Sequence, residues 1–74
     1  MLDNSEKRLA EAGVKVLLGC GGGTCPTIYE DKAGNLLIQG YVLKSEEKTV
    51  FELPAMEDVV RIPKQLILDL ASKL

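Results

Sequence analysis

The stretch "TIYEDKAGNLLIQGYVL" constrains the fold of this chain more than any other. Two runs rich in β-branched and aromatic residues flank "DKAGN", which supplies turn chemistry. Asp31 can form an Asx turn, and Gly34 with the asparagine after it tolerates positive φ. We therefore predict a β-hairpin with strands at residues 27–30 and 36–43. Gly40, inside the second strand, indicates a bulge or a close approach of another backbone.

The segment before the hairpin predicts a short helix and a strand. Asn4 or Ser5 can cap a helix over residues 6–12, and Gly13 supplies the left-handed stop at its end. Such a short helix needs tertiary support. The run "VKVLL", residues 14–18, is apolar and β-branched and predicts a strand. This strand leads directly into a glycine-rich loop.

The second half of the chain predicts two more strands and a helix. Residues 44–48, "KSEEK", are typical of a charged turn, and residues 49–53, "TVFEL", favour a short strand closed by proline. After a loop at "AMED", residues 59–62 predict the last strand. Pro63 suits the first turn of a helix over residues 64–74. The apolar positions of this helix repeat at helical spacing and form one stripe: Leu66, Ile67, Leu70 and Leu74.

The length of 74 residues allows one small domain, residues 1–74, near the lower limit for a chain that folds without staples. The element pattern predicts an α+β fold with a small, mostly antiparallel sheet, a short N-terminal helix and a C-terminal helix. Hydrophobic residues make up 46% of the chain but aromatic residues only 4%, so the core must be aliphatic. Because the margin of stability is thin at this size, we expect a dimer that buries more apolar surface.

Charge and composition exclude several classes of function. The net charge of -2 and the pI near 5.0 disfavour nucleic-acid binding through the overall field. The chain has no histidine, which removes the usual general base and the commonest zinc ligand, so we expect no enzyme. The polar start lacks the apolar run of a signal peptide, and no stretch is long enough to span a membrane. We expect a cytoplasmic protein without a membrane partner.

Cys20 and Cys25 bound a loop that contains three consecutive glycines. The residues of this loop are Gly21, Gly22, Gly23, Thr24 and Pro26. Two thiolates are half of a tetrahedral zinc site, so zinc would have to be shared between two chains. A reversible disulfide is a second hypothesis, although thiol oxidoreductases favour closer spacing. The simplest interpretation is a turn, in which glycine supplies the positive φ that the chain needs to reverse direction, and no cofactor is expected.

A second motif, "VVRIPKQL" at residues 59–66, joins the last strand to the last helix. It resembles the strand-proline-helix step of the swapped-hairpin regulators and antitoxins of the AbrB and MazE type, in which V-x-I-P-[KR]-x-[LI] recurs. The resemblance implies a DNA-binding regulator that uses this junction. Arg61 and Lys64 are the candidate nucleic-acid contacts.

Taken together, "CGGGTCPTIYEDKAGNLLIQGY" and the late "VVRIP" resemble a group of small uncharacterised bacterial proteins. The resemblance covers residues 18–66 and rests on C-P-T-[IV]-Y and Q-G-Y, and it implies a small regulatory or accessory protein. Our leading hypothesis is a non-enzymatic interaction module that acts through a partner protein, as a dimer. DNA binding at residues 59–66 is one alternative. Thiol redox chemistry or metal binding at Cys20 and Cys25 is the other.

Overall fold

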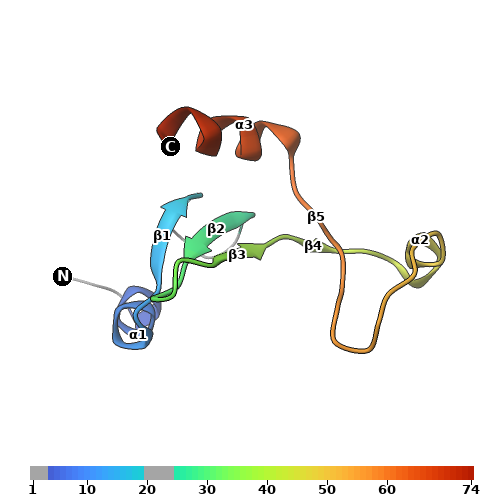
Figure 1. The fold of residues 1–74 in the computed structure, drawn as a ribbon, viewed down its shortest axis with the longest axis horizontal. Helices are drawn as coiled ribbons and strands as arrows, with labels where there is room; N and C mark the ends of the chain where they lie inside the picture. The colour runs from blue at the N-terminus through green and yellow to red at the C-terminus, as the bar shows by residue number, and fades with distance from the viewer. Residues whose placement is uncertain (1–3, 20–24) are drawn as a thin grey trace.

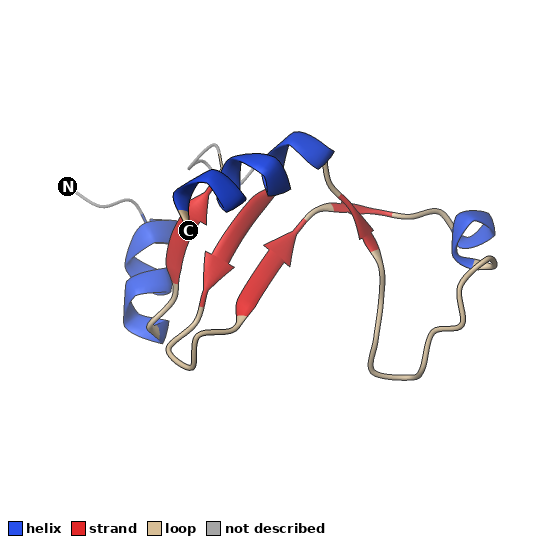
Figure 2. Ribbon diagram, turned by 45° about the horizontal axis from the view of Figure 1, so that its top comes forward, coloured by secondary structure: helices blue, strands red, loops and turns tan. Residues whose placement is uncertain are grey.

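The computed structural model describes residues 4–19 and 25–74 of the chain (Figure 1). In chain order the elements are α1 (Asn4–Ala12), β1 (Lys15–Leu18), β2 (Thr27–Glu30), β3 (Leu36–Gln39), β4 (Tyr41–Val42), α2 (Ser45–Lys48), β5 (Val60–Arg61) and α3 (Lys64–Lys73). One sheet has the strand order β1-β2-β3, and a second pairs β4 with β5, all antiparallel. The α+β prediction, with a helix toward each end, is confirmed (Figure 2).

The hairpin of β2 and β3 closes through a three-residue loop. The amide of Asp31 donates to the carbonyl of Asn35 over 3.0 Å, and the amide of Gly34 donates to the carbonyl of Asp31 over 3.1 Å. Gly34 has φ +88°, the left-handed conformation that glycine adopts at no steric cost. The Asp31 carboxylate accepts the amides of Ala33 and Asn35, which is the predicted Asx turn. The hairpin prediction is confirmed.

Strand β1 lies antiparallel to β2. Their register shifts between Val16 and Leu18, which marks a bulge in β1. Lys15, opposite Glu30 in this register, forms an ion pair with it over 3.2 Å. Before the strand, Gly13 has φ +77° and ends α1 as predicted. The helix itself begins at Asn4, so neither predicted cap residue precedes it.

The predicted second hairpin strand is divided at Gly40 into β3 and β4. A Cβ atom on Gly40 would lie 2.7 Å from the carbonyl oxygen of Arg61 and 2.7 Å from Cγ2 of Ile62. Glycine is therefore required because the backbone of β5 crosses here, which confirms the predicted close approach. Beyond Gly40, residues 41–62 form an extension that leaves the three-stranded sheet, and we call it the arm (Figure 1).

Helix α3 returns from the arm and packs against β1, across one face of the sheet (Figure 2). Among the described residues, the buried apolar side chains are Ile28, Leu43 and Leu70. Leu70 belongs to the predicted apolar stripe of α3, whereas Ile67 and Leu74 of the same stripe are exposed. The buried apolar side chains therefore come from the central strand of the sheet, from the arm and from α3, and part of the apolar stripe of α3 stays uncovered.

Two local predictions in the arm are wrong. Residues 49–53 form no strand, because no strand in the described part of the chain lies beside them to pair with. Residues 45–48, predicted as a turn, form the short helix α2. The Glu47 carboxylate accepts the amide of Lys44 over 3.0 Å and stabilises the first turn of this helix.

Candidate interaction surface

The structure places only part of the predicted cysteine loop. Cys20, Gly21, Gly22, Gly23 and Thr24 lie outside the described residues. Cys25 is half-buried and is not a free thiol, and its carbonyl accepts the hydroxyl of Thr27 over 2.9 Å. Pro26 follows it, also half-buried. Within residues 4–19 and 25–74, no three cysteine, aspartate or glutamate side chains gather closely enough to hold a metal ion. The redox and metal hypotheses stay predictions.

The two predicted nucleic-acid contacts lie on different elements and differ in their surroundings. Arg61, in β5, donates from its guanidinium to the carboxylate of Glu47 in α2. This hydrogen bond raises the pKa of Arg61 and lowers the pKa of Glu47. Lys64 is the exposed first residue of α3. Because the Arg61 charge is already balanced within the chain, it offers less to a phosphate than the sequence suggested.

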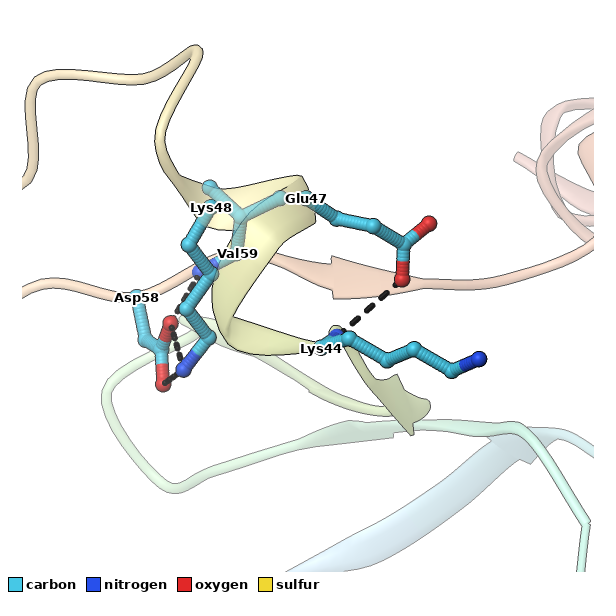
Figure 3. A network of polar contacts seen from close by, with 5 residues as sticks. All are labelled: Lys44, Glu47, Lys48, Asp58 and Val59. Atoms are coloured by element: carbon cyan, nitrogen blue, oxygen red, sulfur yellow. Dashed lines mark hydrogen bonds and ion pairs between the residues drawn. The ribbon is translucent and has the colours of Figure 1, made fainter.

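A second ion pair ties α2 to the chain that leads into β5 (Figure 3). Lys48 Nζ lies 3.1 Å from the carboxylate of Asp58, which also accepts the amide of Val59 over 2.8 Å. The bond from the Val59 amide, followed by the one from Lys48, lowers the pKa of Asp58. The arm is thus closed by polar contacts between two segments whose pairing the sequence does not predict. The only indication of this contact in the sequence is that Lys48 and Asp58 carry opposite charges, and the two residues are far apart along the chain.

We expect these contacts to make the arm sensitive to acid. The pKa values of Glu47 and Asp58 lie below their ordinary values of 4.5 and 3.8, so both carboxylates favour the closed arm when ionised. Their contribution is present at neutral pH and is lost as the pH falls from these values through the lower pKa values of the folded chain. We expect the amide resonances of Val60 and Arg61 to show opening of the arm in that acidic range.

The double variant Glu47→Gln, Asp58→Asn is the control for this prediction. Its amides keep similar shapes but do not titrate, so its arm should change little over the same pH range. High salt should reproduce part of the acid effect in the unmodified chain, because exposed ion pairs are screened. An arm that opens equally with pH in the chain and in the double variant contradicts the assignment to these carboxylates.

Apolar side chains are exposed over much of the described surface. The large exposed ones are Val16, Leu36, Leu37, Ile38, Tyr41, Val42, Val50, Phe51, Met56, Val60, Ile67, Leu68 and Leu74. They concentrate in β3 and in the arm. Single exposed apolar residues are ordinary on protein surfaces, but contiguous apolar patches mark sites of interaction.

In the arm, apolar residues line a cavity of about 540 Å³. Its walls are Leu43, Val50, Phe51, Val59, Val60 and Ile62, with Glu47 and Arg61 at its polar side. The two charges at this side belong to one ion pair. The cavity therefore presents a mainly apolar lining without an unbalanced charge.

In β3, Leu36, Leu37 and Ile38 keep 42 to 48% of their surface exposed although they belong to the sheet. Helix α3 makes its main sheet contacts with β1, at the other edge of the sheet from β3 (Figure 2). The sequence does not predict this surface, because three consecutive apolar residues are typical of a strand that is buried on both faces.

The fold and its surfaces define the class of protein: a small α+β module that presents a half-exposed apolar strand and an apolar cavity. Comparison with family models, curated proteins and solved structures found no match for the chain. Across the described residues, the helices are too short and too polar for one of them to cross a membrane.

Proposed function

We propose that this chain is a non-enzymatic interaction module, of regulatory or accessory type, that acts through a partner protein and associates with itself. Association buries, in an interface, the apolar side chains that a single chain exposes to water. The hydrophobic effect drives such association and requires no catalytic group.

One observation carries the proposal: the chain exposes too much surface for a single folded unit of its size. A compact monomer of 8.0 kDa is expected to expose about 4,450 Å². This chain exposes 5,888 Å². The excess is about 1,400 Å², whereas a stable interface of standard size buries about 800 Å² of each partner. The radius of gyration also indicates an extended chain, because it is 14.0 Å, whereas a compact chain of this length has about 11 Å.

The test is size-exclusion chromatography with light scattering on the purified chain. We expect a mass twice the 8.0 kDa of the single chain at micromolar concentration. Dilution should convert the dimer into monomer, because the fraction of associated chains falls with protein concentration by mass action. A strict monomer at several hundred micromolar would contradict self-association, and the exposed apolar residues would then need another explanation.

A further inference from the structure

We propose that the open edge of β3 pairs antiparallel with β3 of a second copy, so that two three-stranded sheets become one six-stranded sheet. This inference rests on the proposed self-association and adds which surface carries it and in which register.

The hydrogen-bond pattern of the hairpin shows which backbone groups are offered at this edge. Asp31 and Asn35 form a hydrogen-bonded pair, and such pairs alternate along an antiparallel ladder. Following the register, Leu37 therefore turns its amide and carbonyl toward β2. Leu36 and Ile38 turn theirs to the opposite side, where no strand of the described chain lies.

The other edge of the sheet is protected, and β3 is not. Strand β1 carries the charged Lys15, is interrupted by a bulge and contacts α3. Charges, bulges and covering helices are the devices that keep sheet edges from pairing. Strand β3 has the sequence "LLIQ", with no charge and no proline, and its register with β2 is regular. Of the two edges, β3 is the one that is ready to accept a strand.

The composition of β3 favours a second copy over a different partner strand. A two-fold axis brings identical residues together, so a charged strand would repel its own copy. All four residues of β3 are uncharged. The register centred on Leu37 places Leu36 opposite Ile38 of the second copy, so the outward amides and carbonyls of these two residues bond each other. The chain as a whole exposes about 1,400 Å² more than a compact monomer of its mass, so it has surface available for an interface of standard size.

Amide hydrogen exchange tests the pairing directly in the unmodified chain. In a β3-paired dimer, the amides of Leu36 and Ile38 are protected at high protein concentration and exchange fast on dilution to monomer. The amide of Leu37 bonds within the hairpin and stays protected at both concentrations. Fast exchange at Leu36 and Ile38 in a protein that is dimeric by light scattering overturns the inference and leaves the proposed function standing.

Charge exchange at Leu37 tests the register. The variants Leu37→Lys and Leu37→Glu each place like charges across the two-fold axis, so each alone should shift dimerisation to at least tenfold higher concentration. An equimolar mixture should restore a heterodimer, because opposite charges then face each other. Failure of the mixture to associate, with both variants folded by circular dichroism, contradicts this register.

The matched control places the same charge on the arm. Val50→Lys alters an exposed residue of the arm cavity and should leave the dimer intact. If Val50→Lys dissociates the dimer and the Leu37 variants do not, the arm is the interface and the β3 inference is wrong. A wild-type chain that is monomeric throughout overturns both this inference and the proposed self-association.

Discussion

Ile28→Ala is expected to lower the free energy of unfolding by about 2 to 5 kcal/mol, because it removes a fully buried side chain and leaves a cavity. Ile28 is 0% exposed, in the central strand of the three-stranded sheet. The total stability of a chain of this length is about 4 to 11 kcal/mol. One substitution therefore removes a large share of it. Urea denaturation followed by circular dichroism measures the loss as a lower midpoint.

Ile38→Ala is the matched control for this prediction. Ile38 lies directly opposite Ile28 in the hairpin register, yet it is 43% exposed. The same chemical change removes less buried surface there, so the loss should be clearly smaller. Both variants are compared at a protein concentration where the chain is monomeric, because assembly would add to the effect at Ile38. Equal losses would show that the core does not lie where the structure has it.

Gly40→Ala is expected to destabilise the chain by about 1 to 3 kcal/mol through overpacking. The added methyl would lie 2.7 Å from the carbonyl oxygen of Arg61, and a backbone atom cannot move aside as a flexible side chain does. The crossing of β4 and β5 must then widen. Because β5 leads into α3, we expect broadened amide resonances in the arm and at the start of that helix, alongside the lower urea midpoint.

Gly34→Ala separates this steric effect from the ordinary cost of replacing glycine. Gly34 has φ +88°, but a Cβ there would meet no atom within 4 Å. Its loss should be about 1 kcal/mol, from backbone strain alone, and the changed resonances should stay in the hairpin turn. Changes in the arm for Gly34→Ala, or none there for Gly40→Ala, would contradict the assigned causes.

Local chemistry explains which parts of the fold were predictable. Asp31 and Gly34 predict the turn between β2 and β3, and Gly13 predicts the end of α1. The prediction of a strand at residues 49–53 was wrong. β propensity reflects the composition of a segment, but a strand also needs a neighbouring strand to pair with. Val50 and Phe51 have the right composition for a strand and no strand beside them among the described residues.

The candidate surface was less predictable than the fold. Arg61 was correctly placed in a strand before α3, but its partner Glu47 lies 14 positions away and follows from the tertiary fold. The dimer expectation came from size and composition, and it stays a prediction. Which apolar residues remain uncovered depends on where α3 lies on the sheet, and periodicity alone does not determine that position.

The contact between α3 and β1 also sets an order of events in folding. The strands of the β2–β3 hairpin are joined by a short turn, and hairpins of this kind form in about 1 to 10 μs. Helix α3 must instead find a strand about 50 residues away in sequence, and closing so long a loop costs entropy before any contact repays it. The hairpin is therefore expected to form before α3 packs against β1 and Leu70 is buried. During that interval the uncharged edge of β3 belongs to a chain without a completed core, so encounters between chains compete with the last folding step.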